Sequence, residues 1–394
     1  MILHFHYSRV PNSGDVKRIV NINNEMCGIC NSQSVEVLIG PASEKEKCMT
    51  SDYFTLSNNV VKKHYLKMFN VRSVGPIITA IKMMMYVIKY RPSLVIVEWI
   101  IPYFFVEMCR LLCPKTTLIA DIHGAVTEEC IYLEPDLSQS IIKRKRRSEA
   151  YTERKADYVI CQSDEMRKYM NRTYGVPMDR ICVYRCGYDT TMFKVDATAR
   201  ESIRQKLNIG DDLLFVYAGG LHGWQKIEST LLLYKKYHEV NPNSKFLVLT
   251  GNQQILQQKI EEGGLTDMKD SIISFSVPFT EVPKYLNAAD VAFLIRDNHI
   301  MNAVASPTKL AEYLSCGLYV ISSEVAKYWV NADGLKYIID SNNIDSPNVI
   351  DSVVKSTPKT EISAYAKSYL SLDIDHANIN KFFAGKLRIC RLKY

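Results

Sequence analysis

The sequence predicts an α/β protein made of two Rossmann-like domains, each built around a doubly wound parallel sheet. Three observations support this fold class. The 394 residues exceed a typical single domain. Short apolar runs alternate with helical patterns along almost the whole chain. This alternation lapses once, at about residues 187–199, and then restarts, which indicates a linker between two domains of comparable size.

In the first half, apolar runs bounded by turn residues predict strands. These runs lie at 2–7, 34–39, 94–99, 117–121, 157–161 and 181–184. Helical periodicity falls between them, at about 16–32, 77–90, 104–112 and 141–155, and again from residue 163. A long polar segment that includes residues 62–72 is assigned neither helix nor strand. Strands that alternate with helices favour a parallel sheet with crossover helices.

The second half repeats this alternation. Its predicted strands lie at 213–218, 245–250, 271–275, 291–295 and 318–321, and a helix at 226–237 follows the first of them. These strands are short and apolar throughout, as is typical of parallel strands buried on both faces. The second half is therefore expected to form a second doubly wound sheet.

The stretch 304–317 is the most informative part of the chain. Ser306 is a candidate helix cap, Pro307 suits the first helical position, and Gly317 suits the end of the helix. A helix N-terminus favours a phosphate, and Lys309 in the first turn adds a full charge. Glu312, one turn on, can accept hydrogen bonds from ribose hydroxyls. The pattern predicts a nucleotide diphosphate site, although an ordinary capped helix gives the same pattern.

Four loops of the second half support the nucleotide reading. Gly219 and Gly220 follow one predicted strand, Gly251 follows the next, and the loops after residue 275 and before Ser306 follow two others. Because ligands of doubly wound sheets bind at the carboxyl ends of the strands, one nucleotide could contact all four loops. The chain carries neither a P-loop lysine signature nor a GxGxxG motif after its first strand, which disfavours kinase-like and simple dehydrogenase functions.

The cysteine content and the apolar runs indicate the cellular compartment. The 11 cysteines are scattered, and the one CxxC pair, Cys27 and Cys30, lies in a predicted helix without a second pair, so packing is the expected role. Such thiols fit a reducing cytosol. The sequence shows no apolar run of membrane-spanning length and no charged-then-apolar leader, which gives a cytoplasmic expectation.

The positive charge is concentrated in the first half. The net charge is +7, and residues 1–194 hold 27 basic and 20 acidic residues, so the whole excess lies there. The densest run is Lys143, Arg144, Lys145, Arg146 and Arg147. It is either a solvated helix face or a patch that attracts an anionic membrane surface. Nucleic acid ranks last, because no nucleic-acid-binding motif accompanies the run.

An ordered set of motifs runs through the chain. It comprises DIHG (121–124), ADYVICQS (156–163), RCGYD (185–189), YAGGL (217–221), WQK (224–226), VPF (277–279), LNAADV (286–291) and SPTKLAEYLSCG (306–317). In this set the chain resembles glycosyltransferase family 4. The resemblance implies the GT-B fold, in which two Rossmann-like domains face a cleft. It also implies transfer of a sugar from a nucleotide diphosphate with retention of configuration.

The resemblance assigns roles to individual residues. Glu312 matches the glutamate that binds the donor ribose, and His123 matches a first-domain histidine that reaches the donor sugar. The remaining donor-binding candidates match the diphosphate loop, the base-binding turn and the glycine-rich loops: Ser306, Pro307, Thr308, Val277, Pro278, Gly219, Gly220 and Gly251. On the acceptor side the candidates are Ser13, Gly14, Glu128 and Glu129. Glu128 and Glu129 could equally cap the following segment.

Two departures from the family pattern matter. Val304 stands where the family often carries a glutamate that touches the transferred sugar. Gly220 and Gln225 stand where it often carries an arginine and a lysine. The diphosphate still needs cations, and the candidates are Lys309 and Lys226, with Arg296 third. Lys309, Lys226 and His123 are the expected catalytic residues.

The sequence therefore predicts a glycosyltransferase of the hexosyltransferase type that uses a UDP- or GDP-sugar, with no catalytic metal and no cofactor. The acceptor is expected to be a growing, lipid-linked surface polysaccharide at the inner face of the cell membrane. Expected boundaries are 1–190 for the acceptor-side domain and 191–372 for the nucleotide-sugar domain, with a helix in 373–394 that returns to the first domain. Two alternatives stay open: a nucleotide-sugar epimerase and a catalytically silent nucleotide- or glycan-binding subunit.

Overall fold

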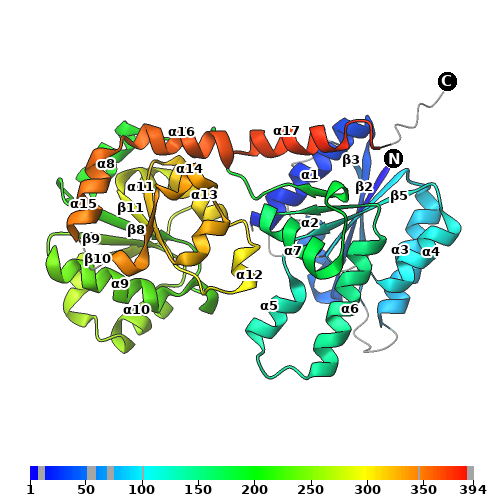
Figure 1. Ribbon diagram of the computed structural model, residues 1–394, viewed down its shortest axis with the longest axis horizontal. Helices are drawn as coiled ribbons and strands as arrows, with labels where there is room; N and C mark the ends of the chain where they lie inside the picture. The colour runs from blue at the N-terminus through cyan, green and yellow to red at the C-terminus, as the bar shows by residue number, and fades with distance from the viewer. Residues whose placement is uncertain (8–13, 51–58, 69–74, 100–101, 345–346, 388–394) are drawn as a thin grey trace. The chain divides into compact units, whose positions relative to one another are not determined.

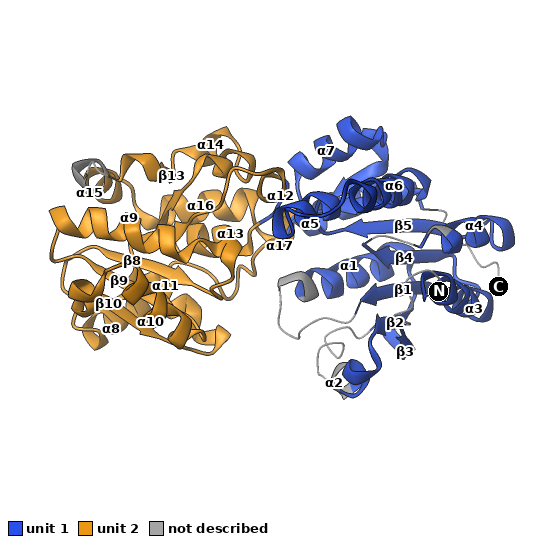
Figure 2. Ribbon diagram, turned by 90° about the horizontal axis from the view of Figure 1, so that it is seen from below, with its two compact units in different colours: residues 1–186, 304–306, 375–394 blue, residues 187–303, 307–374 orange. Residues whose placement is uncertain are grey.

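The computed structural model describes residues 1–7, 14–50, 59–68, 75–99, 102–344 and 347–387 (Figure 1). The chain forms two compact units, which Figure 2 colours separately. Unit 1 comprises Met1–Cys186, Val304–Ser306 and Asp375–Tyr394, and unit 2 comprises Gly187–Ala303 and Pro307–Ile374. The chain thus changes unit at 186/187 and 374/375, where the sequence analysis set boundaries at 190/191 and 372/373.

Unit 1 is built on a seven-stranded parallel sheet in the order β3-β2-β1-β4-β5-β6-β7. Its strands are β1 (Ile2–Tyr7), β2 (Ser34–Gly40), β3 (Val60–Lys67), β4 (Leu94–Glu98), β5 (Thr117–Ile122), β6 (Tyr158–Cys161) and β7 (Ile181–Val183). The strand order reverses between β1 and β4, which is the signature of a doubly wound sheet.

Helices cover both faces of this sheet. They are α1 (Gly14–Cys30), α2 (Lys45–Thr50), α3 (Gly75–Tyr90), α4 (Tyr103–Leu112), α5 (Val126–Leu133), α6 (Gln139–Lys155), α7 (Asp164–Tyr174) and, from Asp375 onward, α17 (Leu372–Phe383). On one face, the ring of Phe5 packs edge-on against Tyr86 of α3 and Phe105 of α4. On the other face, α1 and α17 bury Ile22 and Phe383 in one core with the strands.

Unit 2 is built on a six-stranded parallel sheet in the order β10-β9-β8-β11-β12-β13. Its strands are β8 (Leu214–Ala218), β9 (Lys245–Leu249), β10 (Ile272–Phe275), β11 (Val291–Leu294), β12 (Tyr319–Ser322) and β13 (Ile338–Asp340). Phe215 and Phe293 stack across neighbouring strands with ring centroids 5.4 Å apart, inside a continuous apolar core. Here the order reverses between β8 and β11.

The helices of unit 2 alternate with its strands. They are α8 (Ala197–Lys206), α9 (Ile227–Val240), α10 (Gln253–Glu262), α11 (Val282–Ala288), α12 (Ile300–Ala303), α13 (Thr308–Ser315), α14 (Ala332–Leu335), α15 (Pro347–Ser356) and α16 (Lys359–Tyr369). A buried ion-pair network ties α8 to the start of β11, since Arg200 and Arg204 both contact the carboxylate of Asp290. Asp290 also accepts from the backbone N–H of Leu214, which fixes the start of β8.

The predicted fold class is confirmed, because both halves form parallel α/β sheets. Among the elements that the sequence analysis did not predict are β3, β13 and α5. Strand β3 pairs with β2 at the edge of the sheet, and Lys62 and Lys67 are exposed, so it lacks the apolar run of a central strand. Helix α17 ends at Phe383, before the end of the segment 373–394 in which a helix was expected. Residues 388–394 of that segment lie outside the described residues.

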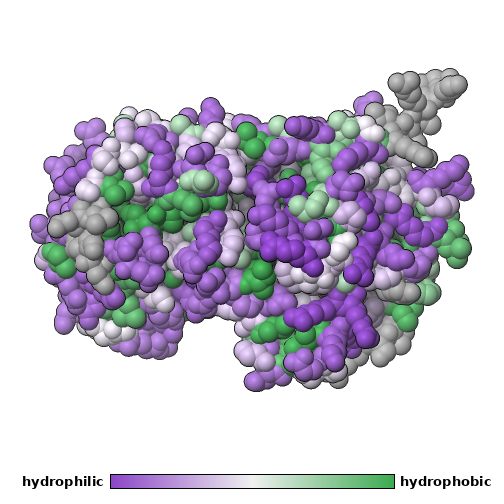
Figure 3. All heavy atoms as spheres, viewed as in Figure 1, coloured by the Kyte–Doolittle hydropathy of each residue, from purple (hydrophilic) through white to green (hydrophobic). Residues whose placement is uncertain are grey.

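Two further observations concern the surface and the thiols. The basic run lies on α6, and Figure 3 shows hydrophilic residues over this helix. Among the helices that the structure describes, none is long and apolar enough to cross a membrane. The nine cysteines whose side chains the structure describes are free thiols. Burial raises the pKa of Cys27 to about 11, as expected for a thiol that packs in the core.

Candidate functional site

The candidate donor-binding residues of unit 2 gather at the carboxyl edge of its sheet. Because β10, β9, β8 and β11 are parallel neighbours, the loops that follow them lie along one edge. Leu221 N donates to Asn252 Oδ1 at 3.3 Å, which joins the loop after β8 to the loop after β9. Gly251 is exposed in that second loop, while Val277 packs against the core beside the exposed Pro278 in the loop after β10.

Helix α13 begins at Thr308, one residue later than the sequence analysis expected. Pro307 occupies the cap position in an extended conformation, so its expected place inside the first turn is wrong. The expected cap, Ser306, is also wrong, because no side chain caps this helix. The Ser306 hydroxyl instead accepts a hydrogen bond from Cys186 N at 3.1 Å, within unit 1.

Lys309 reaches from the first turn of α13 to the carboxyl end of β8. Its Nζ donates to the hydroxyl of Tyr217 at 2.9 Å and to Gln225 Oε1 at 3.0 Å, and it lies 4.3 Å from the centre of the Tyr217 ring. The Tyr217 hydroxyl donates in turn to the carbonyl of Gly220 at 2.6 Å. The hydrogen-bond partners of this ammonium group are therefore neutral groups.

Gly219 makes room for this lysine. Its φ of +134° is a conformation that side chains rarely adopt, and a Cβ built at this position would lie 2.5 Å from Lys309 Nζ. Both the backbone and the space therefore require glycine here. The close approach also brings the lysine ammonium against the backbone where β8 ends, which is the usual place for a ligand of a doubly wound sheet.

The electrostatics of this edge are positive. Burial and the neighbouring charge of Arg296 lower the pKa of Lys309 to about 7, although Glu312 acts in the opposite direction. Arg296 is itself buried just beyond β11, where its Nη1 donates to the carbonyl of Ile295 at 2.9 Å. An anion bound here would favour the charged form of the lysine. Lys309, Arg296 and Glu312 therefore form one interacting group.

Lys226 lies at the same edge but has an acidic partner. It occupies a left-handed conformation ahead of α9, and its Nζ pairs with Asp297 Oδ2 at 2.7 Å. Asp297 directly follows Arg296 in the chain. The structure thus brings the three candidate cations to neighbouring strand ends, with Lys226 bound to a carboxylate and Lys309 held by neutral groups.

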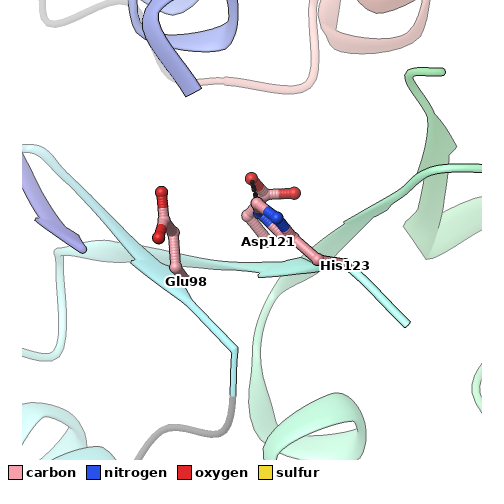
Figure 4. Close-up of side chains that lie close together, drawn as sticks. All are labelled: Glu98, Asp121 and His123. Carbon is pink, nitrogen blue, oxygen red and sulfur yellow. Dashed lines mark hydrogen bonds and ion pairs between the residues drawn. The ribbon is translucent and has the colours of Figure 1, made fainter. Parts of the chain in front are cut away.

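In unit 1, His123 lies just beyond β5 in a buried polar cluster (Figure 4). Its Nε2 is 2.9 Å from Asp121 Oδ2 and 3.2 Å from Arg18 Nη1. Arg18 Nη1 also contacts both carboxylate oxygens of Asp121 at 2.7 Å, and Arg18 Nε donates to the carbonyl of Tyr184 at 3.1 Å. Arg18 from α1 therefore links β5 to the end of β7.

Glu98, Asp121 and His123 place three possible metal-binding atoms within 4.8 Å of one another. Figure 4 shows these three side chains together. The residues do not fit a metal ion, however, because both oxygens of Asp121 already bind the guanidinium of Arg18. A divalent cation would have to displace that buried positive charge or lie beside it.

Two of the four acceptor-side candidates, Glu128 and Glu129, contact other residues of unit 1. Glu128 pairs with Arg146 of α6 at 2.9 Å. The carboxylate of Glu129 lies against Gly124, where a Cβ would collide with it. Helix α5 is capped by Glu149 of α6, which accepts from the N–H groups of Val126 and Thr127, so the predicted capping roles of Glu128 and Glu129 lose support. Gly14 is the first residue of α1, and Ser13 lies outside the described residues.

Sequence reasoning missed several residues that hold these groups. Tyr217 and Gln225 position Lys309, and Arg18 and Asp121 contact His123. Asp121 stands two residues before His123 within the DIHG motif, so that spacing was a usable signal. Arg18 carries no comparable signal, because one arginine in an amphipathic helix usually points to solvent.

Two doubly wound parallel sheets, one in each unit, are the architecture of the GT-B fold. Residues 35–192 match the model of Glycosyltransferase Family 4, so the predicted resemblance to this family is confirmed over that stretch of the chain. No curated protein sequence matches the chain significantly.

Solved structures resemble the whole chain. HepE from Anabaena, solved in complex with UDP, is 14% identical with a TM-score of 0.72 over 98% of this chain and 99% of that chain. WaaG, a glycosyltransferase involved in lipopolysaccharide biosynthesis, is 13% identical with a TM-score of 0.61 over 99% and 96%. A UDP-N-acetylglucosamine 2-epimerase from Listeria monocytogenes, itself assigned without direct proof, is 10% identical with a TM-score of 0.57 over 96% and 94%. The identities are low, so these likenesses establish the fold; together with the family match they support a glycosyltransferase.

Proposed function

We propose that this protein transfers a hexose-type sugar from a UDP- or GDP-sugar to a growing glycan, with retention of configuration. One observation carries the proposal above all: Lys309 Nζ lies at the carboxyl end of β8, against Gly219, with neutral hydrogen-bond partners. A positive group held in this way at a strand end is suited to a diphosphate. The relative HepE was solved with UDP, which supports the same class of donor.

The donor is proposed to bind along the carboxyl edge of unit 2. The diphosphate meets the first turn of α13, where Thr308 and Lys309 stand and backbone N–H groups lack helical partners. Glu312 follows one turn later and accepts from the ribose hydroxyls. Val277 and Pro278, two strands away from β8, hold the base through backbone groups.

In this proposal the chemistry depends on stabilising the departing diphosphate. Lys309 and Arg296 supply positive charge where negative charge develops, and a preorganised group of this kind contributes a large part of many rate enhancements. Lys226 can join them if the donor displaces Asp297 from its ammonium group. His123 orients the transferred sugar. No step of this mechanism uses a metal ion or a cofactor.

The acceptor is proposed to be a lipid-linked glycan at the inner membrane face. Helix α6 carries Lys143, Arg144, Lys145, Arg146 and Arg147, and hydrophilic residues cover it in Figure 3. Arg146 is engaged by Glu128, so the other four side chains are the better candidates for anionic lipid headgroups. Basic residues near an anionic surface contribute about 1 kcal/mol each, enough together for reversible binding.

The first experiment is a thermal stabilisation screen with UDP-, GDP- and CDP-sugars, because a ligand of the native state raises its melting temperature. The stabilising donor is then incubated with lipid-linked acceptors, and products are read by mass spectrometry. Lys309→Met is expected to reduce both the stabilisation and the rate of transfer strongly. Lys235→Met, on an exposed lysine of α9, is the matched control and should leave both intact.

The two alternatives predict different products. A nucleotide-sugar epimerase would give an epimerised sugar nucleotide without acceptor product, and the fold likeness to an epimerase makes this arm of the test necessary. A silent binding subunit would be stabilised by the nucleotide but would give neither product nor slow donor hydrolysis. Acceptor extension that depends on Lys309 supports the transferase and contradicts both alternatives.

A further inference from the structure

The buried cluster around His123 contains an arrangement that the sequence did not single out. Arg18, 2% exposed, and Asp121, fully buried, form an ion pair in which Arg18 Nη1 lies 2.7 Å from each carboxylate oxygen. His123 Nε2 approaches the same pair, at 2.9 Å from Asp121 Oδ2 and 3.2 Å from Arg18 Nη1. The dashed line in Figure 4 marks the contact between histidine and aspartate.

The contact between His123 and Asp121 decides which atom donates. Arg18 Nη1 donates to the carboxylate of Asp121, 2.7 Å from each oxygen, so this carboxylate is ionised and can only accept. If Nε2 carried no proton, its lone pair would face a carboxylate oxygen only 2.9 Å away, which is repulsive. Nε2 must therefore carry the proton and donate it to Asp121 Oδ2.

Both members of the ion pair are charged, so this pattern is stable. Burial acts to raise the pKa of Asp121, but the charge of Arg18 and the hydrogen bond from His123 hold it below its usual value. The pKa of Arg18, although lowered by burial, is raised above its usual value by Asp121. An ionised carboxylate is a fixed acceptor for Nε2–H, and the guanidinium fixes that carboxylate from the other side.

Other groups face the ring without changing this assignment. Glu98 of β4 lies within 4.8 Å, Trp99 lies with its ring centroid 6.1 Å away, and His4 of β1 interacts electrostatically with His123. Burial and the charge of His6 lower the pKa of His4 to about 3, so His4 is neutral at physiological pH. The contact of His123 Nε2 with Asp121 Oδ2, at 2.9 Å, is therefore the one that fixes the proton.

We propose that Arg18 and Asp121 are positioning residues that lock His123 as the Nε2–H tautomer, with Nδ1 as the ring nitrogen that accepts a proton or a hydrogen bond from the substrate. The tautomer assignment stands on the geometry of unit 1 alone. Its catalytic meaning rests on the proposed function, in which His123 orients a sugar hydroxyl. The same arrangement explains why an arginine is buried beneath the end of β5.

The test is ¹⁵N NMR of the full chain with labelled histidine, in which the tautomer is read from the coupling of ring protons to each nitrogen. His123→Asn identifies the signal. The expected spectrum of the wild-type protein at pH 7.5 shows a proton on Nε2 of His123. A proton on Nδ1 instead would overturn the proposal, and this outcome does not depend on any knowledge of the activity.

Asp121→Asn provides the second arm, because an asparagine amide can donate to Nε2 and stabilise the opposite tautomer. We expect the His123 proton to move to Nδ1 and kcat for sugar transfer to fall 10²- to 10⁴-fold with KM changed less than threefold. Arg18→Lys keeps the positive charge and should retain the Nε2–H tautomer. An Asp121→Asn protein that is folded, judged by its melting temperature, and keeps the wild-type tautomer would contradict the proposal. If the tautomer switches but no transferase activity exists in either protein, only the proposed function fails.

Discussion

Lys309→Met removes a cation from the carboxyl end of β8 while it keeps most of the side chain's length. In the unliganded protein, burial and Arg296 lower the pKa of Lys309 to about 7. A bound diphosphate stabilises the ammonium form, so the pKa of Lys309 is higher in the complex. Above pH 7, binding must therefore take up a proton, and affinity must fall as the pH rises.

The structure gives the size of two effects, the pH dependence of UDP affinity and the loss of affinity in Lys309→Met. Between pH 7 and the pKa in the complex, the affinity of the wild-type protein for UDP should fall about tenfold per pH unit, since each unit corresponds to about 1.4 kcal/mol. Below pH 7 the lysine is already charged, and loss of one hydrogen bond from a charged group corresponds to about 1.5–3 kcal/mol. Lys309→Met should then weaken UDP binding by roughly 10- to 150-fold at pH 6.5.

Isothermal titration calorimetry measures the proton directly. UDP binding is recorded at pH 8 in two buffers with different ionisation enthalpies, and the difference in heat gives the number of protons taken up. Phosphate monoesters titrate near pH 6, so UDP itself contributes little at pH 8. The wild-type protein should take up close to one proton per UDP, and Lys309→Met should take up none.

Two further variants sharpen this experiment. Lys235→Met removes an exposed lysine of α9 and should keep the wild-type proton uptake. Gln225→Lys in the Lys309→Met background returns an ammonium group to the position that Lys309 Nζ reaches, because Gln225 Oε1 lies 3.0 Å from it. This double variant should recover part of the affinity. UDP binding by the wild-type protein without proton uptake at pH 8, or equal uptake by Lys309→Met, would refute the reasoning.

Three other predictions follow from single features. Gly219→Ala should cost about 1–3 kcal/mol of stability, because the φ of Gly219 is positive and an alanine Cβ would collide with Lys309. It should also weaken UDP binding at least tenfold. Chemical unfolding and calorimetry measure the two effects, and unchanged values for both would contradict this prediction. Glu153 is fully buried, and burial raises its pKa well above the usual value. The folded state therefore holds a proton that the unfolded state releases, so the free energy of unfolding should fall by up to about 1.4 kcal/mol per pH unit above pH 4.5. Glu153→Gln should remove that slope, as measured by urea unfolding from pH 5 to 8. Equal slopes in both proteins would exclude this group as the cause. Reversing the charges of Lys143, Arg144 and Arg147 should lower binding to vesicles with anionic lipid about 100-fold in sedimentation assays. Binding to neutral vesicles should not change. Equal binding of the wild-type protein to both kinds of vesicle would argue against the membrane patch.

Much of the fold could be predicted because parallel strands buried on both faces leave a clear apolar signal. Strand β11, for example, is wholly buried and lies within a run of apolar residues. The same reasoning fails at the edges of the sheets. Strand β3 exposes Lys62 and Lys67, and β13 is only three residues long, so neither gives the apolar run that marks a central strand.

The candidate site was predictable only in part, for a different reason. Lys309 and Glu312 could be placed one turn apart because both lie on the same short helix. The partners of Lys309 come from residues 217 and 225, more than 80 positions earlier in the chain. Local sequence patterns do not encode such contacts, since they arise when β8 and α13 pack in the folded unit. Arg18 and Asp121 are separated by a similar distance and were missed for the same reason.

Arg18, which is buried, and Lys309, which is partly buried, differ in a way that bears on function. Arg18 is neutralised by Asp121 in a two-oxygen contact, so the pair is complete within the protein. Lys309 is instead held by a phenol and an amide, which leave its charge uncompensated by direct contact. A charge without an opposite charge in contact is unfavourable away from water, and this cost lowers the pKa of Lys309 in the unliganded protein. An anionic ligand removes that penalty on binding, so the unfavourable state of the empty site becomes binding energy for a diphosphate. A carboxylate partner at position 225, as in Gln225→Glu, would remove the penalty without a ligand and should therefore weaken donor binding while it stabilises the unliganded protein.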